Sequence, residues 1–273
     1  MIRSSVLARP QSLPKIAKAT LRSALLPLRV IRGRLRYLSP VPRRFSGAYA
    51  SHAEALAAAE RHGIAGYDHE EVADVAFARM CEVAPWDYPV LFWMRRLSDD
   101  IATLVDAGGH MGTKYRAFRD LLPIAPELRW TVYDLPAIVR AGQRRAEEDG
   151  LENLHFVERM EDAGPVDLFL GSGLLQYLDV PFSELLGRLP LPPRHIILNK
   201  VALRRGRTVV TLEGIGRALV PYQIRKEDSF LTEMNGLGYT LVDRWSIPSL
   251  SHVIETHPEL GASRSEGFYF RRS

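Results

Sequence analysis

The sequence predicts an α/β fold in which a mainly parallel sheet carries helices on both faces. Three observations support this prediction. Strand-like and helix-like segments alternate from about residue 100 to the end. A glycine-rich turn follows the first of these strands, and a carboxylate ends the second. This order of strand, glycine turn, helix and acidic strand end is typical of a nucleotide-binding βαβ unit.

Hydrophobic periodicity and turn residues give the elements in order. We expect strands near residues 102–106, 130–134, 154–158, 166–171, 195–200, 239–245 and 267–271. We expect helices near residues 113–122, 136–149, 180–188 and 226–237, and a further extended piece at 208–212.

Residues 45–100 form a predicted helical cap ahead of the sheet domain, which spans 101–273. Ser51 is a helix N-cap candidate with Glu54 three residues later, and this helix runs to Arg61. A second helix is expected over 70–83 and a short third one over 90–97. A module in this position is expected to cover the active site and shape the substrate pocket.

The composition limits the possible classes of protein. With 273 residues, 46% of them hydrophobic, the chain can bury a full core. The single cysteine, Cys81, excludes an internal disulfide, and no cysteine–histidine spacing suggests zinc or another metal site. No apolar run approaches the roughly 20 residues of a membrane-spanning helix. These features fit a reducing cytoplasm.

The net charge of +4 is a property of the N-terminal segment. Residues 1–53 hold eleven Lys or Arg and no Asp or Glu, whereas residues 54–273 carry a net charge of −7. We interpret residues 1–44 as a basic leader, and its segment 16–31 combines an apolar face with cations. That composition suits an interfacial helix on anionic lipid at the inner face of the membrane, an organelle transit peptide, or a partly ordered leader that packs loosely on the fold. No nucleic-acid recognition motif is present, so a nucleic-acid partner is not expected.

The turn after the first strand is the most informative stretch. Asp106 is followed by Gly108, Gly109 and Gly112. Such glycines allow a sharp turn at positive φ and let a ligand approach the backbone. The dinucleotide fingerprint needs glycines at positions one, three and six; counted from Gly108, His110 occupies position three, so this template fails.

A second acidic residue follows at a matching interval. Asp134 ends the second strand, 22 residues after Gly112. A carboxylate about 20 residues past the glycine turn lies at the end of the neighbouring strand and can accept both ribose hydroxyls. Asp134 is also a helix N-cap candidate before Ala137, and the two roles are compatible.

The block Asp106-x-Gly108-x-His110-x-Gly112 resembles motif I of class I S-adenosylmethionine (SAM) methyltransferases, with one glycine replaced by His110. Together with Ser172-Gly-Leu-Leu-Gln-Tyr177 and Gly238-Tyr239, it resembles an uncharacterised methyltransferase family often found with bacterial surface-polysaccharide genes. The resemblance covers about 45–273. It implies a Rossmann-like sheet of seven strands whose last strand is an antiparallel edge strand beside 239–245.

The resemblance also implies roles for individual residues. Asp106, the three glycines and His110 would lie at the methionine end and adenosine of SAM, although His110 is equally suited to capping the next helix. Asp134 would hold the ribose and Leu135 would pack on adenine. The adenine amino group would meet Glu161 or Asp162, and Ser172 would border the cofactor at the end of the fourth strand.

The resemblance does not indicate which residue would take the proton from the substrate that is methylated. Gln176 stands where plant-type O-methyltransferases have a catalytic histidine, and a glutamine takes no proton at neutral pH. Tyr177 is a candidate for orienting the acceptor. The open alternatives are that His195, His252 or His257 serves as base, or that no base is required. Tyr222 and Arg225 could contact a polar acceptor or belong to an exposed loop.

The sequence therefore predicts a SAM-dependent methyltransferase, most simply an O-methyltransferase with a small polar or glycan-type acceptor. Two alternatives remain open. One is a nicotinamide-dependent oxidoreductase, which shares the βαβ logic but would need a different glycine spacing. The other is a non-catalytic, membrane-associated protein on a methyltransferase fold, suggested by Gln176 and the basic leader.

Overall fold

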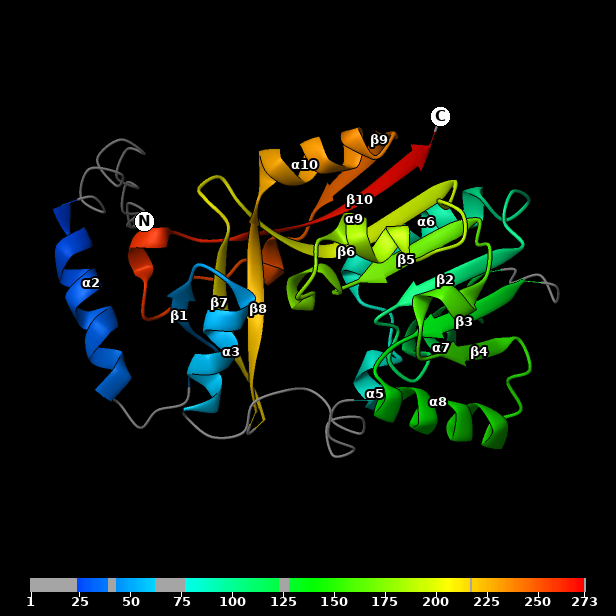
Figure 1. Ribbon diagram of the computed structural model, residues 1–273, viewed down its shortest axis with the longest axis horizontal. Helices are drawn as coiled ribbons and strands as arrows, with labels where there is room; N and C mark the ends of the chain where they lie inside the picture. Colours follow the sequence, from blue (N-terminus) through cyan, green and yellow to red (C-terminus); the bar gives the residue numbers. More distant parts are fainter. Residues whose placement is uncertain (1–23, 39–42, 62–76, 123–127, 217, 273) are drawn as a thin grey trace, which may run out of the picture.

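The structure is a computed structural model, and it describes residues 24–38, 43–61, 77–122, 128–216 and 218–272. Its centre is a sheet whose strands follow the order β4, β3, β2, β5, β6, β10, β9 (Figure 1). The strands span Leu154–Val157 (β4), Arg129–Tyr133 (β3), Thr103–Ala107 (β2), Leu168–Ser172 (β5), His195–Arg204 (β6), Arg264–Arg272 (β10) and Tyr239–Ser246 (β9).

The first five of these strands are parallel, and β10 runs antiparallel to both of its neighbours. This confirms the predicted Rossmann-like sheet with an antiparallel last strand. Its expected pairing with the strand at 239–245 is also confirmed, but its expected place at the edge of the sheet was wrong. β10 lies between β6 and β9, so β9 is the edge strand. The aromatic run Gly267-Phe-Tyr-Phe270 explains this, because Phe268, Tyr269 and Phe270 are all buried and need a helix layer or a neighbouring strand on every side.

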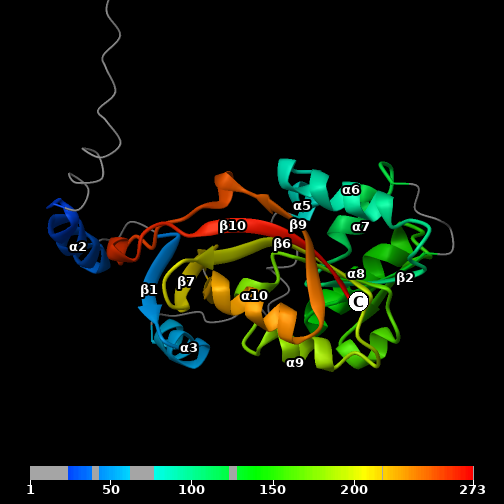
Figure 2. The same cartoon turned by 90° about the horizontal axis from the view of Figure 1, so that it is seen from above.

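Neighbouring residues of the strands pack into opposite layers. Leu104 contacts a core shared with α6 (Tyr88–Arg96), α7 (Thr113–Phe118) and α8 (Pro136–Glu148). Val105, the next residue, contacts a core shared with α9 (Phe182–Gly187) and α10 (Glu227–Gly236). Figure 2 shows α6 and α7 on one side of the sheet and α9 and α10 on the other. The predicted two-sided burial is confirmed and explains the nearly continuous apolar strands.

Three further strands form a second, antiparallel unit. β1 (Phe45–Tyr49), β7 (Val209–Ile215) and β8 (Ala218–Lys226) pair in that order, and α3 (His52–Glu60) packs against β7. β8 joins the main sheet where Leu203 and Arg204 of β6 pair with Arg225 and Lys226. The described residues thus hold ten strands: the seven predicted ones of the main sheet, β7 at the extended piece expected near 208–212, and β1 and β8, which were not predicted.

The predicted cap is partly helical. Ser51 caps α3, since its Oγ accepts a hydrogen bond from the Glu54 N–H at 3.2 Å, as expected. Phe45–Tyr49 is a strand instead, because its partner β7 lies far along the chain and leaves no local signal. Residues 70–76 of the predicted helix over 70–83 lie outside the described residues, and within 77–83 only Phe77–Met80 is helical, as α5.

At the N-terminal end of the described chain, α2 (Leu26–Leu35) and η1 (Arg36–Leu38) dock on the turn η6 (Pro258–Leu260). Gly33 provides the contact, since a Cβ there would lie 2.8 Å from Pro258 Cδ. Arg34 donates hydrogen bonds to the Thr256 carbonyl and the Glu259 carboxylate, and Arg36 pairs with Glu255. One face of α2 is therefore anchored.

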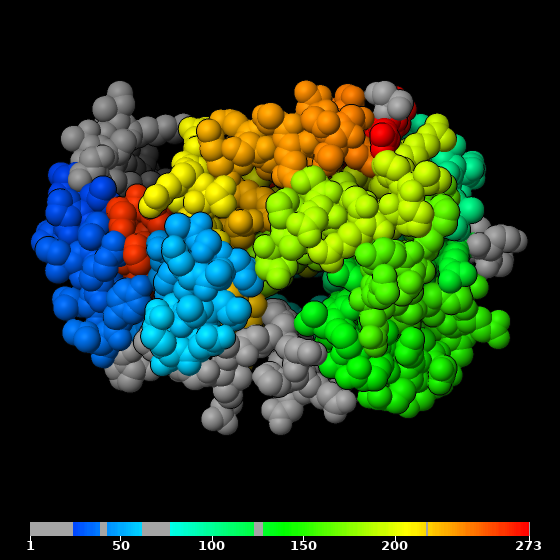
Figure 3. Space-filling view, viewed as in Figure 1, coloured from blue at the N-terminus to red at the C-terminus, as the bar shows by residue number. Residues whose placement is uncertain are grey.

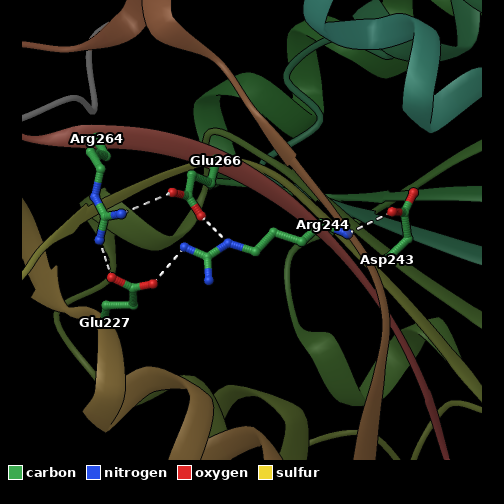
Figure 4. Close-up of polar contacts among 5 residues, drawn as sticks. All are labelled: Glu227, Asp243, Arg244, Arg264 and Glu266. Atoms are coloured by element: carbon green, nitrogen blue, oxygen red, sulfur yellow. Dashed lines mark hydrogen bonds and ion pairs between the residues drawn. The ribbon is translucent and has the colours of Figure 1, made fainter.

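A network of two arginines and two glutamates ties α10 to the edge of the sheet (Figure 4). Arg244 of β9 bonds both Glu227, the first residue of α10, and the buried Glu266 of β10. Arg264 of β10 contacts the same two carboxylates. The network fixes where the last helix meets β9 and β10.

Candidate active site

The glycine turn joins the carboxyl end of β2 to α7. Gly108 has φ of +69° and its N–H donates to the Tyr133 carbonyl at 2.8 Å, which ties the turn to the end of β3. Gly112 has φ of +74° and is the N-cap of α7. His110 also has positive φ, +56°. Histidine is one of the few residues other than glycine that adopts this conformation with some frequency, which explains how it replaces a motif glycine.

Gly109 leaves room for the carboxylate behind it. A Cβ at this position would lie 2.6 Å from Asp106 Oδ2 and 3.0 Å from the Asp106 carbonyl oxygen. Asp106 is 1% exposed and its Oδ2 accepts a hydrogen bond from Trp130 Nε1 at 3.3 Å. Burial raises the pKa of Asp106 to about 7, and the Trp130 hydrogen bond opposes this only in part.

Asp134 lies against the same turn. Its Oδ2 accepts the His110 N–H and its Oδ1 accepts the Leu135 N–H, both at 2.8 Å. Burial raises the pKa of Asp134, and the two backbone hydrogen bonds oppose the rise. The predicted juxtaposition of the acid and the glycine turn is present. Each carboxylate oxygen keeps a second lone pair that can accept a hydroxyl.

The remaining cofactor-side candidates lie around this pair. Leu135 precedes α8 and is 40% exposed. Glu161 and Asp162 are exposed in η3 (Met160–Ala163), just after β4. His110 places its ring 6.4 Å, centroid to centroid, from Phe77 of α5. The N-cap of α7 is Gly112 rather than His110, so a capping role does not account for the histidine.

The loop after β5 borders the glycine turn from the other side. A Cβ on Gly108 would lie 3.2 Å from Leu174 Cδ1. Ser172 ends β5 and Gln176 lies in η4 (Leu175–Tyr177). Among the residues that the structure describes, Ser172 Oγ and Gln176 Oε1 are buried and have no hydrogen-bond partner. Buried polar atoms without partners are uncommon, so these two oxygens are candidates for contact with a ligand.

Tyr177 points away from this region. Its hydroxyl donates to Glu213 Oε2 at 2.7 Å and its ring meets Tyr222 edge-on at 5.5 Å, centroid to centroid. Burial raises the pKa of Glu213, although the Tyr177 hydrogen bond favours its ionised form. Tyr177 thus links η4 to the second antiparallel unit. Tyr222 and Arg225 belong to strand β8 and are buried, so the exposed loop expected there is wrong.

None of the three candidate histidines is well placed to serve this edge. His195 begins β6, at the opposite end from the parallel strands' carboxyl edge, and its Nδ1 lies 2.9 Å from the Tyr269 hydroxyl oxygen. His252 packs against Phe45 of β1, and His257 lies beside Thr256 near α2.

A buried polar cluster that the sequence did not predict closes the site. Asp87 is fully buried, accepts Lys114 Nζ at 2.7 Å, and lies 3.4 Å from the Asn199 amide nitrogen. Lys200 follows Asn199 in β6 with φ of +60°. The only sequence signal for this cluster was that the apolar residues 196–198 are followed by two polar residues, Asn199 and Lys200.

The surface is hollowed beside these loops. Figure 3 shows a depression between the lime residues around α9, the green part of the chain that contains α7 and α8, and the light-blue α3. Ligands of open parallel α/β sheets bind outside the carboxyl ends of the strands, which is where Asp106, Asp134 and Ser172 lie here.

Comparisons with known proteins bear on the fold. No family model and no curated protein matches the sequence. The structure is similar to the N-terminal domain of EvdMO1 with S-adenosylhomocysteine (SAH) bound, at 12% identity over 81% of this chain and 97% of that one, with a TM-score of 0.51. It is also similar to OxaC, at 18% identity and a TM-score of 0.50, over 76% of this chain and 52% of OxaC.

The chain therefore spans about half the length of OxaC. At these identities the similarity concerns the fold. Strand order, the antiparallel β10 and the glycine turn after β2 agree with it. The protein has the Rossmann-like fold of class I SAM-dependent methyltransferases.

Proposed function

We propose that the protein is a SAM-dependent methyltransferase that transfers a methyl group to an oxygen of a small polar or glycan-type acceptor. The observation that carries the proposal is the contact between Asp134 and the glycine turn. It brings a ribose-binding carboxylate to the turn at the carboxyl edge of the sheet. The methyltransferase fold supports the reaction, and the resemblance of the Ser172–Tyr177 block to a methyltransferase family supports SAM as the cofactor.

The described residues fit this cofactor. Gly108 and Gly112 give the turn its positive φ angles, Asp134 has lone pairs for two hydroxyls, and Leu135 is exposed beside it. Ser172 Oγ and Gln176 Oε1 provide buried polar atoms without partners in the described chain. SAM supplies an electrophilic methyl group on a sulfonium. The protein's task is to position the acceptor and exclude water, which can lower a barrier by several kcal/mol.

Isothermal titration calorimetry on the full chain tests the proposal. SAM and SAH are expected to bind with micromolar affinity, and NADH at the same concentration is expected not to bind. No binding of SAM or SAH at millimolar ligand rejects the methyltransferase. Binding of NADH alone would instead favour the nicotinamide-dependent oxidoreductase. Methyl transfer that is lost in Asp134→Ala would exclude a non-catalytic protein.

We further propose that α2 binds the surface of an anionic membrane. No helix in the described parts of the chain has the length and apolar character needed to cross a bilayer, so this contact would be peripheral. The face of α2 opposite the Gly33 anchor carries Leu28, Ile31 and Leu35, which are 64%, 58% and 57% exposed. They recur at helical spacing and form an apolar stripe.

Cations flank the stripe. Arg29 and Arg32 are exposed and make no ion pair within the described residues, unlike Arg34 and Arg36. An apolar stripe bordered by unpaired arginines matches the interfacial region of a bilayer with anionic headgroups, each nearby arginine contributing about 1 kcal/mol.

Vesicle co-sedimentation tests the membrane proposal. The full chain is expected to pellet with vesicles of phosphatidylglycerol and phosphatidylcholine, less with phosphatidylcholine alone, and less at high salt. The pair Leu28→Glu and Ile31→Glu should abolish pelleting, whereas the matched control Leu191→Glu, at an exposed leucine outside α2, should not. Equal pelleting of all variants rejects the proposal.

A further inference from the structure

Lys200 occupies an unusual backbone position midway along β6, directly after Asn199, the last residue that pairs with β5. Its φ of +60° is left-handed, which costs a non-glycine residue on the order of 1 kcal/mol. The cause is a bulge against β10. Leu198 pairs with Phe268 and Val201 with Glu266, so Asn199 and Lys200 together oppose the single residue Gly267. Bulges of this kind redirect a side chain and are frequent beside active sites.

The bulge sends the Lys200 side chain across the loop that follows β5. A methyl group built on Gly173 would lie 3.1 Å from Lys200 Nζ and 3.5 Å from Gln176 Nε2. Gly173 has φ of +82° and its N–H donates to the Asn199 carbonyl at 2.9 Å, which holds the two loops together. The ammonium therefore lies beside the Ser172–Gln176 loop, where the candidate site has its buried, unpartnered oxygens.

Within the described residues, no carboxylate forms an ion pair with Lys200. The described residues include no hydrogen bond or ion pair to its Nζ. The charged groups that act on it are Lys114 from α7, Asp87 from η2 and Asp106 from β2. Asp87 is bound to Lys114, and Asp106 is bound to Trp130. Burial, reinforced by the charge of Lys114, lowers the pKa of Lys200 to about 8.

We propose that Lys200 faces the transferred methyl group and is the catalytic residue that receives the acceptor's proton. This inference rests on the proposed function. Lys200 would thus be the proton acceptor, a role that Gln176 cannot perform. The acceptor hydroxyl gives its proton to the neutral Nζ while its oxygen takes the methyl group, and the electron pair of the broken S–C bond stays on sulfur. The products are a methyl ether, SAH and a protonated Lys200, so charge and atoms balance.

A comparison of SAM with SAH tests the proposal without knowledge of the acceptor. The two ligands share all binding groups, but only SAM carries the sulfonium charge. A protonated Lys200 beside the methyl group repels SAM and not SAH. The ratio of SAM to SAH association constants, measured by calorimetry, is therefore expected to rise about threefold or more between pH 6.5 and 9.5, with a midpoint near 8.

Two variants assign this rise to Lys200. In Lys200→Met the repulsion by Lys200 is absent, so the ratio should vary only with titration of Asp106 and of the ligands themselves, without the step near pH 8. In Lys200→Arg the charge persists, so the ratio should also lack this step and should be lower. Lys226→Met, at a lysine of β8 outside the site, should behave as the wild type.

The outcomes separate this inference from the proposed function. If neither ligand binds, the methyltransferase itself is rejected. If both ligands bind wild type and the ratio has the same pH profile as in Lys200→Met, the role of Lys200 is overturned while the methyltransferase stands. If Lys200→Met fails to fold, Lys200→Arg decides the question, because a midpoint near 8 that persists in this variant overturns the role of Lys200.

Discussion

The carboxylate of Asp134 accepts the backbone N–H of His110 at 2.8 Å, so the acid that ends β3 is fixed to the glycine turn after β2. Two loops that are separated by the whole of α7 thus form one unit. Three of its members, Gly108, Gly112 and His110, have positive φ. The hydrogen bond fixes the two loops relative to each other, which lowers the ordering cost of binding a ligand there.

The first prediction concerns this carboxylate. Asp134→Asn keeps the volume but removes the charge, and we expect SAM affinity to fall roughly tenfold to a hundredfold, the typical loss for a hydrogen bond to an ionised group. Asp134→Ala should lose at least as much. Calorimetry measures both, with the exposed Glu152→Gln as control. Wild-type affinity in Asp134→Asn would remove Asp134 from the cofactor site.

A second prediction follows from the buried Asp106. Its pKa in the folded protein is about 7, well above the unfolded value near 3.9. Between these values the folded state binds more protons than the unfolded state, so stability falls as pH rises from about 4 to 7. Asp106→Asn should be more stable than wild type at pH 8, by about 1–4 kcal/mol.

The stability gap should shrink as pH falls. Below the unfolded pKa both states of the wild type are protonated and the penalty disappears. Urea unfolding at pH 4.5 and at pH 8 measures the gap in the free energy of unfolding. An equal gap at both pH values would show that Asp106 is ionised in the fold and that the prediction is wrong.

The third prediction contrasts two glycines. Gly109→Ala places a Cβ against the Asp106 carboxylate and its backbone carbonyl, so we expect a loss of about 1–3 kcal/mol in stability and a loss of SAM binding. Gly236→Ala lies at the end of α10 with no atom within 4 Å, and should be neutral or stabilising by up to about 1 kcal/mol. Thermal unfolding compares them; equal effects would refute the crowding argument.

The fourth prediction concerns the network in Figure 4. Arg244→Met leaves Glu266 buried with only Arg264 nearby, at 3.7 Å, and is expected to cost about 2 kcal/mol or more. Arg188→Met removes an exposed i,i+4 pair with Glu184 and should have a much smaller effect on stability. Denaturant unfolding gives both values. A similar small loss in both variants would mean that the network contributes little.

Much of the fold could be predicted because its signals are local. The parallel strands begin and end within a few residues of their expected positions, since apolar runs bounded by turn residues mark them. The Ser51 cap and the positive-φ glycines 108 and 112 follow from turn and cap chemistry. Asp134 could be placed because strand order fixes which carboxyl ends are neighbours.

The parts that were missed depend on partners far along the chain. β1 is a strand only because β7 lies beside it, and β8 contains Pro221 and follows a glycine-rich turn, which weakened its strand signal. Tyr177 turns toward Glu213 because β7 and β8 are present. The conformation of Lys200 results from the register of β10, which no local pattern encodes.

Strand β6 belongs to two sheets at once. Its first half lies beside β5, and its last residues pair with β8, with the left-handed Lys200 between them. Because side chains alternate between the two faces of a strand, removing one residue after Lys200 would move the side chains of Ala202 and Leu203 to the opposite faces of β6. It would also disrupt the pairing that joins the smaller sheet to the main sheet. The chain length between those halves is thus as strictly constrained as any binding residue.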